Sequence, residues 1–208
     1  MTDSFTPYCK NRLRKAALHL LAWLLLACGS ALAQGLTEVS QLRIERTDEE
    51  LQLSAQLQFE ISPAVEEALA KGIPMVFVVN ADVVKERWYW YDKKLVAAER
   101  FMRLAYQPLT RRWRLNVNSG QAVNSGVGLA LNQSFDTLAQ ALSAIKRIAK
   151  WKIADASDID TTGKYKLDFR FKLDLSQLPR PFQIGALGQS DWDVSASVLA
   201  PLVVESVK

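Results

Sequence analysis

The chain has 208 residues, with 26 Lys and Arg against 22 Asp and Glu, and a formal net charge of +4. Hydrophobic residues make up 49% of the sequence, which excludes a disordered chain, and the length allows one ordinary domain with its own core. Both cysteines and the single histidine lie within the first 33 residues, so the remaining 175 residues have no side chain for chemistry that requires a thiol or an imidazole.

The first 33 residues have the pattern of a cleaved secretory signal. Four basic residues precede an apolar run over residues 16–27, and a small-x-small pattern ends at Ala33, directly before Gln34. The run is shorter than the about 20 apolar residues of a membrane-spanning helix. We therefore predict cleavage between Ala33 and Gln34, a periplasmic location and no transmembrane span after processing. The alternative is a lipoprotein anchored through Cys28, because residues 25–29 resemble a lipobox.

Removal of this signal changes the composition of the remaining chain. Residues 34–208 hold 22 basic and 21 acidic residues, and a net charge of +1 gives no reason to expect nucleic-acid binding. They contain neither Cys nor His. This excludes a disulfide, a thiol nucleophile, a Ser-His-Asp triad and a Cys/His zinc site. We therefore expect no cofactor, no metal and no enzymatic activity.

Residues 164–175 alternate strictly between apolar and charged side chains. The apolar positions are Tyr165, Leu167, Phe169, Phe171, Leu173 and Leu175. Such alternation predicts a strand with one face in a core and the other in water. Residues 51–61, 75–83, 111–117 and 192–198 follow the same pattern, with a bulge expected near Val84. The predicted fold class is mainly β: an antiparallel β-sandwich of about seven or eight strands in a single domain over residues 34–208.

Two helices are predicted between these strands. Ser62 and Pro63 begin a short connector helix, which ends at Gly72. Ser134 caps a main helix whose apolar positions recur at helical spacing as far as Ala149. Two further segments are expected to be irregular: residues 118–128, rich in Asn, Ser and Gly, predict a loop, and the two prolines within residues 176–184 predict an extended path.

Basic residues are concentrated in residues 85–114. This stretch has nine basic and three acidic residues, a net charge of +6, against −5 for the rest of residues 34–208. We expect that this stretch forms a surface that binds an acidic envelope protein or an anionic envelope component. Its candidate residues are Arg87, Arg100, Arg103, Arg112 and Arg114. The alternative is a solvated sheet face whose charges only discourage edge pairing.

Four consecutive aromatic residues, Trp88, Tyr89, Trp90 and Tyr91, occupy both faces of one predicted strand. One face belongs to the core. The other is either covered internally or forms a platform on which a sugar or lipid ligand stacks. A sugar- or lipid-binding module is therefore the alternative function.

Two acidic segments have residue types found in metal-binding loops or in the active sites of hydrolases. Residues 158–163 resemble the start of a calcium loop, but Phe169 stands at position twelve where a bidentate glutamate is required, so no metal is predicted. Asp191 and Asp193 would share one strand face, and paired carboxylates are the basis of a third hypothesis, an Asp/Glu-dependent hydrolase. Alternation beside a buried Trp192 explains the two residues without chemistry.

One segment carries a family resemblance. The sequence Leu173-Asp174-Leu175-Ser176-Gln177-Leu178-Pro179-Arg180-Pro181-Phe182-Gln183, followed by Asp191-Trp192, resembles a proteobacterial family of exported proteins catalogued as a domain of unknown function (DUF4390). The pattern Leu138-x3-Leu142-x2-Ile145-x2-Ile148-x2-Trp151 is similar too. The resemblance covers nearly all of the chain after residue 33. It implies an envelope location and a link to a membrane sensor kinase, and it assigns no active site. We expect a non-catalytic binding or interaction module of the cell envelope.

The export signal makes a direct prediction. Protein recovered from the periplasm should have the intact mass of a chain that begins at Gln34, because the signature places cleavage after Ala33. A lipid-modified Cys28 as the first residue would contradict this and establish the lipoprotein alternative.

Overall fold

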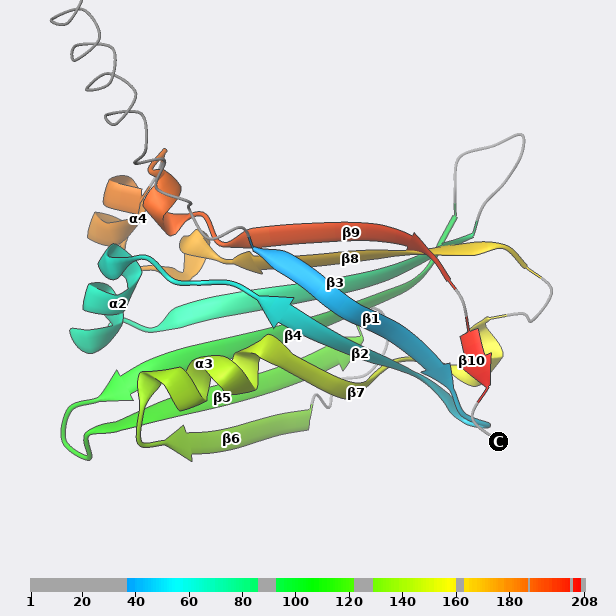
Figure 1. Ribbon diagram of the computed structural model, residues 1–208, viewed down its shortest axis with the longest axis horizontal. Coiled ribbons are helices and arrows are strands. Elements are labelled where there is room, and N and C mark those ends of the chain that lie inside the picture. Colours follow the sequence, from blue (N-terminus) through cyan, green and yellow to red (C-terminus); the bar gives the residue numbers. More distant parts are fainter. Residues whose placement is uncertain are drawn as a thin grey trace, which may run out of the picture. The chain divides into compact units, whose positions relative to one another are not determined.

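The computed structural model describes residues 37–85, 93–121, 129–159, 163–186, 188–202 and 204–206. These residues form ten strands, three α-helices and three short 3-10 helices (Figure 1). In chain order the elements are β1 (Glu38–Arg46), β2 (Glu50–Gln58), α2 (Pro63–Ala70), β3 (Met75–Lys85), β4 (Lys93–Gln107), β5 (Arg112–Gln121), β6 (Leu129–Phe135), α3 (Leu138–Lys146), β7 (Arg147–Asp155), η1 (Ala156–Asp158), β8 (Tyr165–Leu173), η2 (Leu175–Gln177), α4 (Arg180–Ala186), η3 (Ser190–Trp192), β9 (Ser195–Pro201) and β10 (Val204–Ser206).

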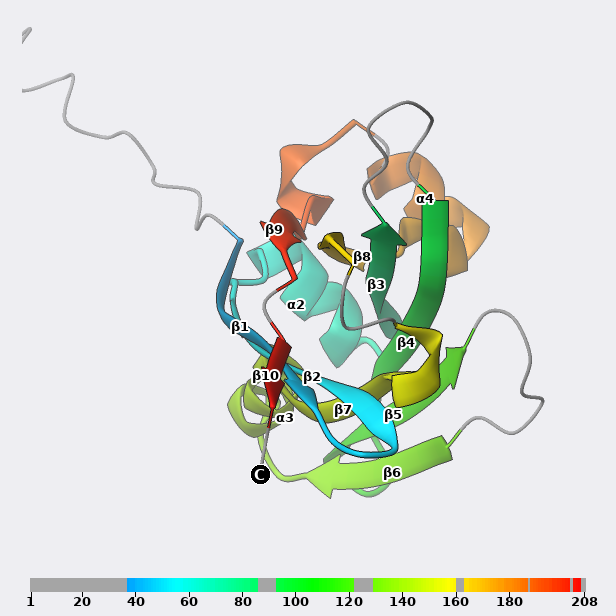
Figure 2. The same cartoon turned by 90° about the vertical axis from the view of Figure 1, so that its right-hand side faces the viewer.

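The strands form two sheets that lie one over the other (Figures 1 and 2). The six-stranded sheet has the order β6-β5-β4-β3-β8-β9, and the four-stranded sheet has the order β10-β1-β2-β7. Every pairing is antiparallel except that between β1 and the three-residue strand β10, which is parallel. The predicted mainly β, sandwich-like fold is confirmed.

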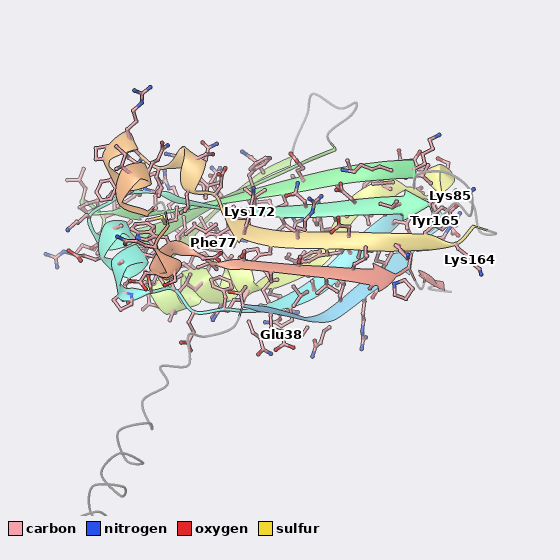
Figure 3. All side chains as sticks on the ribbon, turned by 90° about the horizontal axis from the view of Figure 1, so that it is seen from above. Glu38, Phe77, Lys85, Lys164, Tyr165 and Lys172 are labelled. Carbon is pink, nitrogen blue, oxygen red and sulfur yellow. The ribbon has the colours of Figure 1, made fainter. Side chains whose placement is uncertain are left out.

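Strand β8 pairs with β3 on one side and β9 on the other, and its alternation is the one predicted. The side chains of Leu167, Phe169 and Phe171 are buried, whereas Lys172 is exposed. Figure 3 shows Tyr165 and Lys172 at opposite ends of this strand. Apolar side chains of β8 therefore face the four-stranded sheet, and its charged side chains lie on the outer face of the six-stranded sheet.

Strands β3, β4 and β5 form an antiparallel meander, and the alternation predicted for residues 75–83 and 111–117 is present in β3 and β5. Alternate residues of β3, from Met75 to Val83, are buried, and in β5 the buried Leu115 directly follows the exposed Arg114. The register of β3 against β4 shifts between Val83 and Val84, where a bulge was expected.

The connector helix α2 has the predicted ends. The Ser62 hydroxyl accepts a hydrogen bond from the backbone N–H of Val65 at 3.3 Å, and Pro63 is the first helical residue. Gly72 follows the helix with φ of +83°, a left-handed conformation that favours glycine.

The predicted main helix is shorter and begins later than expected. Ser134 belongs to β6, and the cap of α3 is Thr137, whose hydroxyl accepts a hydrogen bond from the N–H of Gln140 at 3.3 Å. The chain then passes directly from α3 into β7.

The helical prediction failed beyond Lys146 because the apolar residues there also fit an irregular strand. Ile148 and Trp151 are three residues apart, a spacing that would place them on opposite faces of a regular strand. The pairing of β2 with β7 has register shifts, and Lys150 has φ of +45°. These irregularities allow both Ile148 and Trp151 to be buried.

Three other boundaries differ from the prediction. Residues 118–121 belong to β5, and the rest of the predicted loop, 122–128, lies outside the described residues. The segment predicted as extended forms η2 and α4, because Pro181 stands in the first turn of a helix, where its missing N–H costs nothing. The last long strand begins at Ser195, after η3, so Asp191 and Asp193 share no strand face.

The burial of β8 predicts unequal effects along this strand. Phe169→Ala should lower the free energy of unfolding by about 3–5 kcal/mol, because it removes a fully buried ring. Lys172→Ala should lower it by about 0.5 kcal/mol or less, because that side chain is exposed. Chemical denaturation of both variants measures the difference, and similar losses would contradict the assignment of faces.

Candidate binding surface

The outer face of the six-stranded sheet brings together side chains from four strands. In one row of the sheet, Lys172 of β8 lies beside Val78 of β3, Val78 beside Phe101 of β4, and Phe101 beside Asn118 of β5. Arg103 lies in the next row, between Val76 and Asn116. Side chains at matching positions on neighbouring strands point to the same side, so these residues share one surface.

The centre of this surface is apolar. Val78 is only 5% exposed although it points away from the core, and the Phe101 ring beside it is 40% exposed. Val76 is partly exposed in the adjacent row. The partly exposed ring beside Val78 therefore presents apolar surface to the solvent on the outer face of the sheet.

Three cations surround this apolar centre. Arg103, Arg114 and Lys172 are exposed, and within the described ranges none of them has a carboxylate in salt-bridge contact. Arg103 and Arg114 lie on adjacent strands one row apart, whereas β5 and β8 are separated by three strand spacings, about 14 Å. We call the surface formed by Val76, Val78, Phe101, Arg103, Arg114 and Lys172 the cationic face.

Other cations of the same sheet are neutralised by ion pairs. Arg112 contacts the Asp136 carboxylate at 3.0 Å. Asp82, which is 3% exposed, is paired with Lys94 at 2.7 Å and with Arg170. Arg103, Arg114 and Lys172 have no such pair within the described residues, so their charge is available to a partner.

Arg100 does not belong to the cationic face. Its guanidinium lies 4.7 Å from the centre of the Trp151 ring, between the two sheets, and its Nε–H donates a hydrogen bond to the Ser119 hydroxyl at 2.9 Å. Burial lowers the pKa of Arg100 to about 10. The prediction that Arg100 shares a surface with the other arginines is wrong, because Arg100 and Arg103 are an odd number of residues apart on one strand.

Several sequence candidates lie outside the described residues. They are Arg87, the aromatic residues Trp88, Tyr89, Trp90 and Tyr91, and the predicted cleavage site at Ala33 and Gln34.

The acidic candidates are distributed without a common centre. Asp191 lies in η3, and the Asp193 carboxylate accepts a hydrogen bond from the Ser195 hydroxyl at 2.7 Å. Asp158 accepts one from the backbone N–H of Asp155 at 3.2 Å, at the start of η1. Within the part of the chain that the structure describes, no three His, Cys, Asp or Glu side chains are grouped to hold a metal ion.

Sequence reasoning missed Val76, Val78, Phe101 and Lys172 as members of the surface. Phe101 is an odd number of residues from the buried Met102 and Leu104, so it points to the opposite face of β4. Its position on the outer face could therefore have been predicted from the sequence. Lys172 had no such signal, because it reaches the surface only through the pairing of β8 with β3.

The position of Arg100 predicts an unusual effect on stability. Arg100→Met should leave the melting temperature unchanged or raise it, because an apolar chain of similar length replaces a buried charge that has no carboxylate partner among the described residues. Trp151→Ala, the matched truncation of the ring beneath it, should lower the free energy of unfolding by about 3–5 kcal/mol. A large loss of stability in Arg100→Met, measured by thermal denaturation, would show that the ring contact outweighs the cost of burial.

Comparison with known proteins supports the resemblance seen in the sequence. The model of a family described as Domain of unknown function (DUF4390) matches residues 35–199, which include every strand from β1 to β8 and most of β9. No curated protein and no solved structure is significantly similar to the chain. Among the described residues, none of the helices combines the length and apolar character needed to cross a membrane. The matched region contains the whole cationic face, and the chain belongs to the DUF4390 family.

Proposed function

We propose that this protein is a non-catalytic binding module of the cell envelope, exported to the periplasm as residues 34–208, and that its cationic face binds an anionic envelope component. One observation carries the proposal: three cations without carboxylate partners in the described residues surround an exposed aromatic ring. Lys94, Arg112 and Arg170 of the same face are already engaged in ion pairs.

The free cations favour an anionic partner on electrostatic grounds. A group of like charges on one face produces a potential that attracts opposite charge and raises the rate of encounter. Arg103 and Arg114 are within one row of each other, so a single anionic group can interact with both. The guanidinium of Arg also binds carboxylate and phosphate groups in a bidentate manner.

The apolar centre of the cationic face can contribute hydrophobic binding energy in addition to the electrostatic attraction. Aromatic residues and Arg are the residue types enriched in binding interfaces, and covering Phe101 removes apolar surface from water. The ring lies between Val78 and Asn118, so it is supported by strands on both sides. A rigid sheet face of this kind presents its side chains with little loss of entropy on binding.

The export signal and the composition support the remaining parts of the proposal. Residues 34–208 contain no His and no Cys, the residue types on which most nucleophilic and acid–base chemistry depends. The family resemblance implies a link to a membrane sensor kinase, so the exported part of such a kinase is one acidic partner to include in a test. The described residues give no observation that favours the aromatic platform or the hydrolase.

Charge reversal on the cationic face tests the proposal. We predict that Arg103→Glu/Arg114→Glu retains its melting temperature within a few degrees, because both side chains are exposed and make no ion pair in the described residues. The double variant should lose retention on vesicles of phosphatidylglycerol and phosphatidylcholine, or on the partner captured from envelope extract. Retention of the wild type should weaken with salt, since the Debye length falls from about 10 Å at 0.1 M to about 3 Å at 1 M.

The matched control is Arg147→Glu/Lys150→Glu on the four-stranded sheet. Both residues are exposed and belong to β7, so this variant has the same change in net charge away from the cationic face. Equal loss of retention in the two double variants would indicate a response to net charge alone. If the wild type has no salt-sensitive partner on vesicles or in extract, the cationic face is ordinary solvated surface and the proposal is wrong.

A further inference from the structure

A groove of about 160 Å³ opens between β1 and the edge strand β9, where the two sheets meet without backbone pairing between these strands. Six of its seven described lining residues have apolar side chains: Leu42 and Ile44 come from β1, Leu167 from β8, and Ala200 and Pro201 from β9, with Leu202 beside them. Ile44 and Leu167 are core residues, 4% and 2% exposed. The groove therefore leads from the surface directly to the hydrophobic core.

Arg43 is the charged residue of the lining, and a β-bulge places it there. The register of β1 against β2 shifts between Ser40 and Arg43, and Gln41 has φ of +51°. Without the extra residue, alternation from the inward-facing Val39 would direct Arg43 into the core and Ile44 outward. The bulge reverses this, so Ile44 is buried and Arg43 is exposed at the groove.

The bulge has a conformational cost that calls for an explanation. A left-handed backbone is uncommon for a residue other than glycine, and such positions concentrate at binding and active sites. Arg43 has no ion pair within the ranges that the structure describes. The result of the irregularity is one unpaired guanidinium beside an apolar groove.

We propose that this groove binds a medium-chain fatty-acid anion, with the end of its hydrocarbon chain against Ile44 and Leu167 and its carboxylate at Arg43. The volume decides the size of the ligand: a cavity of about 150 Å³ lined by apolar side chains holds one benzene-sized group, so the groove accommodates a single short segment of chain. The lining decides its chemistry, because hydrocarbon in contact with these residues extends the core. The guanidinium decides the head group, since its paired N–H donors match a carboxylate.

The groove is separate from the cationic face and does not depend on the function proposed for that face. Pro201, at the groove, pairs with Lys166 of β8, whereas Lys172 of the cationic face pairs with Ser195 at the other end of β9. Figure 3 shows this separation along β8, with Tyr165 at one end of the strand and Lys172 at the other. A ligand in the groove and a partner on the cationic face can therefore be tested independently.

The experiment is a titration of the purified protein with octanoate, followed by amide chemical shifts, with octanol as the uncharged probe of the same length. Octanoate should bind saturably and shift the amides of residues 42–44, Leu167 and Ala200. Arg43→Gln should weaken octanoate binding about two- to fivefold, the effect typical of an exposed ion pair, and leave octanol binding unchanged. Ala200→Phe, which fills the groove, should abolish binding of both probes.

Leu199→Phe is the matched control for the filled groove. Leu199 precedes Ala200 and is 66% exposed on the opposite face of β9, so a ring there does not enter the groove and octanoate should bind as to the wild type. Absence of saturable binding, or shifts confined to other strands, would overturn the proposal. An equal loss of octanol binding in Arg43→Gln would show that Arg43 acts through the shape of β1 rather than its charge. If Ala200→Phe does not fold, the wild-type shift map and Arg43→Gln decide the question.

Discussion

The two sheets are joined by three phenylalanine rings, and the rest of the architecture depends on this contact. Phe77 of β3 and Phe171 of β8 stack with ring centres 5.9 Å apart and planes 1° apart. Phe59, which follows β2 in the four-stranded sheet, lies 5.7 Å from the first ring and 5.1 Å from the second. Pairs of this kind contribute about 0.5–1.5 kcal/mol beyond the burial of their area. Burial of β3 and β8 on one face follows, and charge is confined to the other.

This confinement explains how an acidic side chain comes to be buried on the outer face of a sheet. Asp82 belongs to β3, the most buried strand, and it points away from the phenylalanine cluster. Lys94 and Arg170 cover it from the neighbouring strands, and both remain about half exposed. A buried carboxylate needs such partners, because the cost of desolvation is otherwise not recovered. Asp82 therefore occupies Lys94 and Arg170, whereas the cations of the cationic face have no ion pair among the described residues and neutralise no buried carboxylate there.

The strands that alternate strictly could be predicted from the sequence, and the segments with two possible periods could not. In β8 every charged residue falls on the same parity, so no other assignment buries the apolar set. Around Ile145, Ile148 and Trp151 a spacing of three fits a helix, and only pairing with β2 selects the strand. For a related reason, only part of the cationic face could be predicted from the sequence. Parity assigns Arg103 and Arg114 to the outside, but the row of Lys172, Val78 and Phe101 requires the register of three strands.

Net charge along the sequence is therefore a poor measure of charge on a surface. Five basic residues between positions 94 and 114 have different roles: Arg100 is turned between the sheets, Lys94 and Arg112 are neutralised, and Arg103 and Arg114 have no ion pair among the described residues. The same reasoning applies to the edges of the sandwich. Helix α3 contacts both sheets and covers one side. On the opposite side β1 and β9 approach without pairing, and a single extra residue in β1 decides whether an arginine faces the core or the solvent. The charge of a surface in this fold depends on the face to which each side chain points and on the register of the strands, which a count of charges along the sequence does not contain.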